Sequence, residues 1–182
     1  MVIENKDEEQ FVIVDINDDP LHYVTGKKAL HDYKEGEYHR GVHVFIELPR
    51  GRFMIQLKGE GTENAGKWSS SVSGHVRAGE DYKAAAVREI MEEVGLHIDP
   101  AELEQLGVMH PCAETGNEFA ALFTYLMADT EYPRPDMEEV KELAVVRMSD
   151  LVRDLKANKE KYSPAFLIMF KLFEDVYISK GE

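Results

Sequence analysis

The segment from Gly74 to Leu96 (GHVRAGEDYKAAAVREIMEEVGL) holds the residues of this sequence that are best suited to chemistry. A glycine opens it, and four charged residues come close together near its end: Arg88, Glu89, Glu92 and Glu93. Clustered carboxylate oxygens are the ligands that Mg²⁺ and Mn²⁺ prefer. Such a cation also lets an anionic substrate approach an acidic cluster, because it neutralises charge between them. The segment therefore predicts a divalent-metal site.

A helix must present these carboxylates, and the spacing predicts one from Asp81 to Val94 with Gly95 as its C-terminal stop. At about 100° per residue, the apolar positions form one stripe that we expect to face the core: Val87, Ile90, Met91 and Val94. The three glutamates are neighbours on the opposite side. Three glutamates on an arbitrary helix are usually a solvated face, but Gly74 permits close backbone approach and favours the metal site.

Carboxylates held on one helical face repel one another. We therefore expect Glu89→Gln and Glu93→Gln to remove metal-dependent activity while thermal stability stays similar or rises.

The spacing from Gly74 to Leu96 resembles the signature of Nudix hydrolases at every defined position. The resemblance implies an α/β protein with the Nudix α/β/α sandwich around a mixed β-sheet. It implies metal-dependent hydrolysis of a diphosphate bond in a nucleoside diphosphate derivative or a related organic diphosphate, with Mg²⁺ or Mn²⁺ as cofactor. The partner is then a small-molecule diphosphate, and homodimers are common in the family.

The same resemblance implies roles for individual residues. The expected metal ligands are Glu89, Glu92, Glu93 and the backbone carbonyl of Gly74 or Ser73. The expected catalytic residues are Glu92, Glu93, Glu118 and Arg88. We expect Arg88 to orient the glutamates, either by pairing with Glu92 at i+4 or by reaching Glu80 across the loop.

A wider similarity, from His39 to Glu118, is to the branch of the Nudix superfamily that includes isopentenyl-diphosphate isomerase. It rests on His39-Arg40, Trp68, Gly74-His75 and Asn117-Glu118. In that isomerase the counterparts of His39, His75 and Glu118 help to bind metal, and the counterpart of Glu118 also moves protons. His31 is a further metal candidate. We interpret the other histidines as hydrogen-bonded or surface residues: His22, His43, His97 and His110.

The chain departs from the isomerase at Ser73, which stands where the isomerase has a cysteine directly before the Gly-His pair. The single cysteine, Cys112, lies in another loop. The hydrolase signature is complete here, whereas isomerases carry a degraded version. We therefore predict a hydrolase, with an isopentenyl-diphosphate isomerase-like enzyme as the alternative. A non-catalytic Nudix-fold metabolite binder is the third reading, although such binders typically lose motif glutamates.

Three side chains outside the segment are also candidates. Glu118 is expected to be an extra metal ligand or the general base that takes a proton from water. Glu139, in the acidic run before the next strand, is a second candidate for that base. Lys58, at a strand end beside a glycine-rich loop, is a candidate for binding substrate phosphate, with a solvated lysine as the alternative.

Composition bounds the remaining possibilities. The chain has 182 residues and a formal net charge of −14, which predicts one domain over residues 1–182 and argues against binding to nucleic acid. No apolar run approaches the roughly 18 residues that a membrane span needs. A single cysteine and an acidic N-terminus without an apolar leader predict a cytoplasmic protein.

Local patterns predict the elements that surround the segment. Strands are expected at 11–16, 41–48, 53–57, 106–110, 118–127 and 140–148, with an extended stretch at 68–73. Further helices are expected at 149–157, with Ser149 as N-cap, and at 164–178, where Ser163 is the N-cap and Pro164 follows. A short helical turn is expected at 26–33. Loops at 59–67, 111–117 and 131–136 are expected to recognise the rest of the substrate.

Overall fold

The computed structural model describes residues 8–32 and 34–180. Its strands are β1 (Gln10–Val14), β2 (Pro20–Thr25), β3 (His39–Leu48), β4 (Arg52–Lys58), β5 (Trp68–Ser69), β6 (Val72–His75), β7 (Glu104–Met109), β8 (Glu118–Leu126) and β9 (Val140–Arg147). Its α-helices are α1 (Tyr82–Val94), α2 (Met148–Ala157) and α3 (Pro164–Lys180). Its 3₁₀ turns are η2 (Lys27–His31), η3 (Pro100–Glu102), η4 (Ala113–Thr115) and η5 (Lys159–Lys161).

A seven-stranded mixed sheet forms the centre of the molecule, and β3 pairs with three other strands of it. The pairing with β8 is parallel and places His39 opposite Glu118. The pairing with β6 is antiparallel and places Gly41 opposite His75. Neighbouring strands lie about 4.8 Å apart. The register of β3 therefore brings together side chains that are far apart in the sequence.

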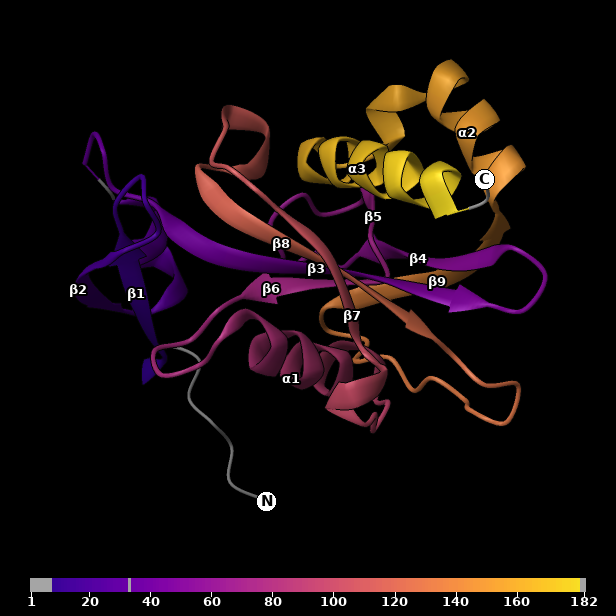
Figure 1. Cartoon of the computed structure of the whole chain (residues 1–182), viewed down its shortest axis with the longest axis horizontal. Helices are drawn as coiled ribbons and strands as arrows, with labels where there is room; N and C mark the ends of the chain where they lie inside the picture. Colours follow the sequence, from indigo (N-terminus) through magenta and orange to yellow (C-terminus); the bar gives the residue numbers. More distant parts are fainter. Residues whose placement is uncertain (1–7, 33, 181–182) are drawn as a thin grey trace.

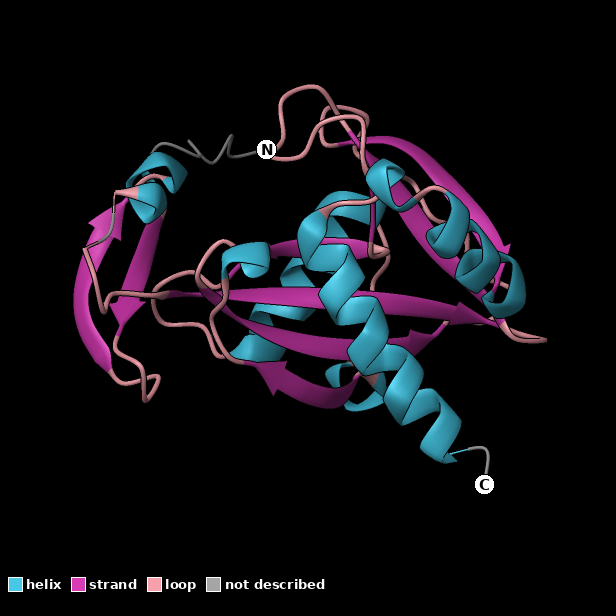
Figure 2. Cartoon of the chain, turned by 90° about the horizontal axis from the view of Figure 1, so that it is seen from above, coloured by secondary structure: helices cyan, strands magenta, loops and turns pink. Residues whose placement is uncertain are grey.

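Helices cover both faces of this sheet (Figure 1). On one face α1 packs through a core that includes Ile90, Val94 and Val42. On the other face α2 and α3 pack through an aromatic core that includes Phe45 and Phe166, and α3 runs across the sheet in Figure 2. The predicted α/β/α sandwich with a mixed sheet is confirmed.

The strands β1 and β2 form a separate two-stranded sheet beside the main one (Figures 1 and 2). Phe11, Ile13 and Leu30 form its own small buried cluster. Backbone bonds join it to the main body, from Val14 N to the Tyr38 carbonyl and from Ala78 N to the Gln10 carbonyl. The second hydrogen bond attaches this hairpin to the loop that precedes α1.

Helix α1 begins and ends where the sequence predicts. The Asp81 side chain accepts a hydrogen bond from Ala84 N, and Gly95 adopts a left-handed conformation with φ 68° at the C-terminus. The predicted core stripe is only partly right, because Ile90 and Val94 are buried but Met91 is 41% exposed. The helix is rotated so that Ala85, Ala86, Glu89 and Glu93 are buried as well. The prediction that all three glutamates face away from the core is therefore wrong.

Other local predictions need correction. Strand β2 pairs with β1 and is not among the predicted strands; it follows directly on turn residues, and most of its length is exposed. Helix α2 begins at Met148 with Arg147 as N-cap, so Ser149 lies inside the helix and is not its cap. The reason is that β9 pairs with β4 as far as Arg147 and keeps the backbone extended to that point. Ser163 does cap α3, where its hydroxyl accepts a hydrogen bond from Phe166 N.

Within the described ranges, every helix is too short or too polar to cross a membrane.

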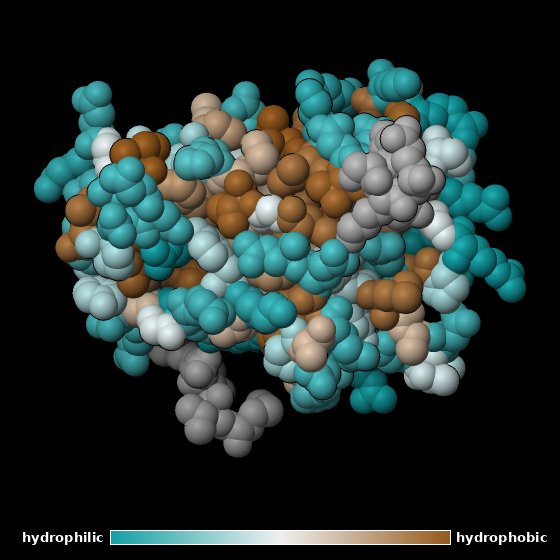
Figure 3. All heavy atoms as spheres, in the orientation of Figure 1, coloured by the Kyte–Doolittle hydropathy of each residue, from teal (hydrophilic) through white to brown (hydrophobic). Residues whose placement is uncertain are grey.

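The face shown in Figure 3 is largely hydrophilic, with hydrophobic residues gathered in its middle over β7 and α3. The sheet ends at β7 on this side, where Val108 is 37% exposed.

Candidate active site

A cavity of about 450 Å³ opens beside α1, and charged and polar side chains form much of its lining. The motif helix contributes Glu89 and Glu93, and β6 contributes Ser73, Gly74 and His75. The paired strands β3 and β8 contribute His39, His43 and Glu118. Lys58 reaches it from the end of β4. Helix α1, strands β4 and β6 and the parallel pair β3–β8 thus contribute side chains to one cavity.

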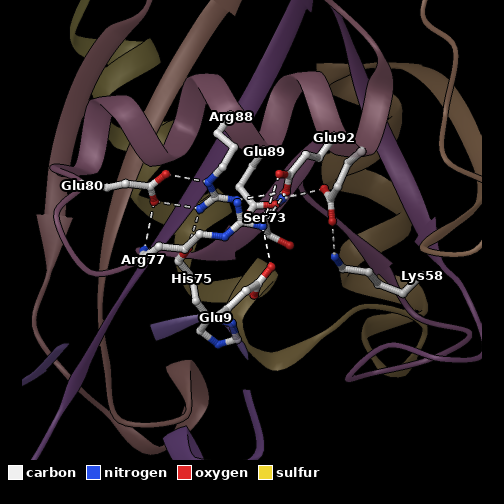
Figure 4. Close-up of polar contacts among 10 residues, drawn as sticks. Glu9, Lys58, Ser73, His75, Arg77, Glu80, Arg88, Glu89 and Glu92 are labelled. Atoms are coloured by element: carbon white, nitrogen blue, oxygen red, sulfur yellow. Dashed lines mark hydrogen bonds and ion pairs between the residues drawn. The ribbon is translucent and has the colours of Figure 1, made fainter. Parts of the chain in front are cut away.

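Glu93 is the most deeply buried of the motif glutamates, with an exposed fraction of 1%. Its carboxylate accepts hydrogen bonds from Lys58 Nζ at 3.0 Å, Gln56 Nε2 at 2.9 Å and the backbone N–H of Ser73 at 2.9 Å. Figure 4 shows Lys58 reaching towards α1. The Lys58 side chain is 11% exposed, so the solvated-lysine alternative is wrong. Lys58 lies in the cavity, where its ammonium neutralises Glu93.

Arg88 holds several carboxylates in place, as predicted (Figure 4). Its Nε and Nη2 donate to the two oxygens of Glu80 at 2.6 and 2.9 Å, and Nη2 also donates to the His75 carbonyl. Its Nη1 donates to Glu89 at 2.7 Å and to Glu92 at 3.0 Å. Both predicted partners, Glu80 and Glu92, are therefore present at once. Arg88 thereby connects the loop that precedes α1 to the helix itself.

Glu92 lies apart from the other two motif glutamates. Its side chain is 41% exposed and does not line the cavity. Besides Arg88, it contacts Arg77, whose guanidinium also pairs with the buried Glu9 side chain. Sequence reasoning missed Arg77 and Glu9, because neither belongs to the motif pattern. This pair connects the segment before β1 to the exposed side of α1.

The Glu89 carboxylate lies directly against Gly74. A Cβ built on Gly74 would lie 2.1 Å from the Glu89 carboxylate, which is too close for any real contact. Burial raises the pKa of Glu89 to about 7, and the nearby Glu93 and Glu92 carboxylates add to this, while Arg88 opposes it. The structure thus gives Gly74 a steric role in addition to its predicted role as a backbone ligand.

A second cluster surrounds Glu118. The Nε2 atoms of His39 and His43 each lie 3.5 Å from a Glu118 oxygen, and His43 Nδ1 is 2.7 Å from Ser70 Oγ. Burial by itself raises the Glu118 pKa, but the two imidazoles outweigh it and lower the pKa to about 2. Glu118 is therefore ionised throughout the neutral range.

These two clusters fit a divalent cation. Ligand atoms of His39, His75 and Glu118 lie within 4.8 Å of one another, and carboxylate and imidazole are both ligands for divalent metal ions. A Cβ on Gly41 would lie 2.2 Å from Glu118, so glycines leave room at both Glu118 and Glu89. Oxygens from Glu89, Glu93 and Glu118 face the same cavity, which leaves net negative charge there for a cation to offset.

The predicted residues are placed as follows. The predicted residues that line the cavity are Glu89, Glu93, Glu118, Lys58, Gly74, Glu139, His39 and His75. Glu92 and Arg88 do not line it. The side chain of His31 lies outside the part of the chain that the structure describes. His97 and His110 are exposed, and His22 pairs with Glu37 at the surface, as predicted. His43 is hydrogen-bonded as predicted, but it also lines the cavity. Because side chains two or four residues apart on a strand point to the same face, its position four residues after His39 could have indicated this.

Comparison with known proteins agrees with this fold. The sequence profile of the NUDIX domain matches residues 37–166, so the chain belongs to the Nudix family. Its class is that of the Nudix hydrolases.

An isopentenyl-diphosphate Delta-isomerase from Serratia proteamaculans is 28% identical over 170 residues, which cover 90% of this chain and 90% of that protein. A prenyl-diphosphate phosphatase from Methanosarcina mazei is 28% identical over 157 residues, covering 84% of this chain and 87% of that protein. A crystal structure of a Deinococcus radiodurans protein superposes with a TM-score of 0.69 at 19% identity, covering 82% of this chain and 90% of that chain. The resemblance to the isomerase branch is thereby confirmed.

Gly74→Ala should lower hydrolytic activity by about 10- to 100-fold, because the new methyl group displaces the Glu89 carboxylate. The effect is measured as kcat/KM at saturating metal. Gly61→Ala is the matched control, because Gly61 lines the same cavity and a Cβ there meets nothing within 4 Å. Equal activity of the two variants would show that the close contact at Gly74 is irrelevant.

Glu89 should give the metal-free protein a distinctive pH dependence. Its folded pKa, about 7, lies above the ordinary value of 4.5, so the protonated form stabilises the fold. This contribution is complete below pH 4.5 and is lost as the pH rises through 7. The Tm of the native protein should therefore fall between pH 5 and 8 relative to that of Glu89→Gln. Parallel curves would contradict this. Glu118 does not interfere, because its lowered pKa acts only as the pH falls from 4.5 towards 2.

Proposed function

We propose that this Nudix hydrolase cleaves the diphosphate bond of a nucleoside diphosphate derivative or a related organic diphosphate, with Mg²⁺ or Mn²⁺ as its cofactor. The observation that carries the proposal is the convergence of Glu89, Glu93 and Glu118 on one cavity next to Lys58. When bound, the divalent cation neutralises phosphate charge and activates water for attack at phosphorus.

The residues of the chain divide the remaining work. The proposed ligands beside α1 are Glu89, Glu93 and the Gly74 carbonyl. Glu92, on the exposed side of α1, is a further proposed ligand. His39, His75 and Glu118 are the proposed second ligand group. Arg88 keeps Glu89 oriented through the contact at 2.7 Å.

Other residues that line the cavity are proposed to accept protons and to contact phosphate. Glu118 is ionised near neutral pH and is proposed to accept a proton from water or to hold a second cation. Glu139 lines the cavity and is the second candidate for that base. Lys58 is proposed to contact phosphate once its pairing with Glu93 is relaxed, since it is one of two lysines that line the cavity among the described residues.

The isomerase alternative draws on the names of several relatives, which cover most of this chain. Against it stands Ser73, whose backbone N–H binds Glu93. Isomerisation of isopentenyl diphosphate needs groups that give and remove protons at carbon, and a serine hydroxyl is far less acidic than a thiol. Hydrolysis makes no demand on this side chain. The complete glutamate set likewise argues against a non-catalytic binder.

A substrate panel distinguishes these functions. Purified protein is incubated with nucleoside diphosphate derivatives, dinucleotides, nucleoside triphosphates and prenyl diphosphates, each with Mg²⁺ or Mn²⁺, and phosphate-containing products are separated. We expect hydrolysis of at least one diphosphate, its loss with chelator, and retention of most activity by Ser73→Ala. Conversion of isopentenyl diphosphate to dimethylallyl diphosphate without phosphate release would establish the isomerase instead.

A cytoplasmic location, a single functional domain over residues 1–182 and a homodimer remain part of this proposal. Sedimentation of the purified protein tests the last of these.

A further inference from the structure

A glutamine occupies a core position on strand β4. Side chains two residues apart on a strand point to the same face, so Met54, Gln56 and Lys58 lie in one row. Met54 belongs to the core cluster that also contains Ile90 of α1, and Lys58 lines the cavity at the other end of the row. Gln56 lies between them with an exposed fraction of 0%. A polar side chain therefore stands where an apolar one would complete the core.

The amide of Gln56 is only partly satisfied by hydrogen bonds. Its Nε2 donates a hydrogen bond to Glu93 Oε2 at 2.9 Å, but its Oε1 is buried and has no hydrogen-bond partner among the described residues. A buried polar atom without a partner lowers stability. The opposite orientation of the amide would place Oε1 against the Glu93 carboxylate, and two acceptors repel each other. The donor side of Gln56 must therefore face Glu93.

The two carboxylate oxygens of Glu93 have different kinds of partner. Oε2 accepts hydrogen bonds from Gln56 Nε2 and from the backbone N–H of Ser73, each at 2.9 Å. Oε1 accepts one from Lys58 Nζ at 3.0 Å. The donors to Oε2 are neutral and belong to strands β4 and β6. The donor to Oε1 lies at the end of a long, flexible side chain that lines the cavity. Oε1 is therefore the oxygen that becomes available when Lys58 turns towards a phosphate.

The pair of donors on Oε2 fixes how the Glu93 carboxylate is turned. The last torsion of a glutamate side chain is broad, so one hydrogen bond leaves the carboxylate free to rotate. Two donors from different strands restrict this rotation, and Gln56 supplies the one that comes from a side chain. A ligand that is oriented before a cation arrives binds it more tightly, because less ordering remains to be done on binding.

We propose, on the basis of the hydrolase function proposed above, that Gln56 is a positioning residue. By holding Oε2 of Glu93, it presents Oε1 to the cavity as the oxygen that binds the divalent cation. Gln56 does not itself line the cavity within the part of the chain that the structure describes, so it acts through Glu93. Its loss should therefore weaken metal binding much more than substrate binding.

The test is Gln56→Met, which keeps a side chain of similar length and removes its hydrogen-bond donor. Binding of Mn²⁺ to the purified full chain is measured by calorimetry without substrate, and the substrate KM is measured at saturating Mg²⁺. We expect the Kd for Mn²⁺ to rise by about tenfold or more, while KM stays close to that of the native protein. Gln56→Asn keeps the amide but shortens it by one methylene, so it should weaken Mn²⁺ binding in the same direction.

Thr124→Val is the matched control for loss of a buried polar group. Thr124 is buried, its hydroxyl donates a hydrogen bond to the Phe45 carbonyl, and it does not line the cavity. This variant should lower the Tm and leave the Kd for Mn²⁺ unchanged.

Three results would overturn the role of Gln56. They are unchanged Mn²⁺ binding in the folded Gln56 variants, an equal loss of Mn²⁺ affinity in Thr124→Val, and failure of both Gln56 variants to fold, since Gln56 would then be structural. Weaker Mn²⁺ binding by the Gln56 variants, together with no hydrolysis of any diphosphate by the native protein, would leave the inference standing and refute the hydrolase function instead.

Discussion

Glu93→Gln is expected to lower kcat/KM by at least about a thousandfold at saturating Mg²⁺, because the cavity loses a buried carboxylate that is fixed by three hydrogen bonds. The structure also reverses the expected effect on stability. Repulsion among the motif glutamates predicts an unchanged or higher Tm, but Glu93 pairs with Lys58, which is only 11% exposed. Removing one partner of a buried pair costs about 3 kcal/mol or more.

A double-mutant cycle separates the two effects. Lys58→Met combined with Glu93→Gln should restore much of the lost stability, because no buried ammonium is then left without its partner. Activity should stay low in the double variant. Near-native turnover by Glu93→Gln would refute the assignment of Glu93 as a ligand. The exposed Glu92 serves for comparison, and Glu92→Gln should cost less activity and little stability, because its side chain is 41% exposed.

Glu118→Gln is expected to lower kcat by about a hundredfold or more and to change KM much less. Glu118 is buried at the start of β8 and lies between two imidazoles, so its charge acts on the reacting centre more than on substrate binding. The Tm should fall at neutral pH. A carboxyl whose pKa is lowered to about 2 stabilises the fold above pH 4.5, and the amide cannot do so.

The neighbours of Glu118 show how that effect arises. Ser70→Ala removes the hydroxyl that lies 2.7 Å from His43 Nδ1. Ser70 is fully buried and does not line the cavity. The kcat of this variant should therefore lie between those of the native protein and Glu118→Gln, because the change acts through His43. If Glu118→Gln changes only the Tm and not kcat, Glu118 is structural. Glu139→Gln then becomes the variant that should abolish proton transfer.

Much of the site was predictable because it lies within one helix and the turn before it. Arg88 and the three glutamates take their relative positions from the geometry of one helix, and Gly74 and Glu80 lie in the short stretch of chain just before it. The contacts of Arg88 with both Glu80 and Glu92 follow from these short separations along the chain. The caps at Asp81 and Gly95 are equally local, and so are the strands with clear runs of β-branched residues.

Only the tertiary structure decided which face of that helix is buried. Periodicity placed Met91 inside and all three glutamates outside, but the sheet covers α1 from a direction that buries Glu89 and Glu93 and exposes Met91. The physical reason is that the missing side chain of Gly74 leaves space for the Glu89 carboxylate, while Lys58 and Gln56 compensate Glu93 from another strand. Burial of a charge depends on such partners, and no pattern within the helix contains them.

The sequence by itself determined the Nudix signature, the kind of metal-binding side chains and the layers of the fold, because these depend on residue types at short, fixed spacings. The place of His43 beside Glu118 depends instead on strand register, since β3 and β8 are joined by a long stretch of chain and pair in parallel. The lining of the cavity likewise depends on several separate segments that meet only in the folded protein. Contacts between distant segments are set by packing of the whole core, and this is why the sequence indicated the loops at 59–67 and 111–117 but not how they meet around the cavity.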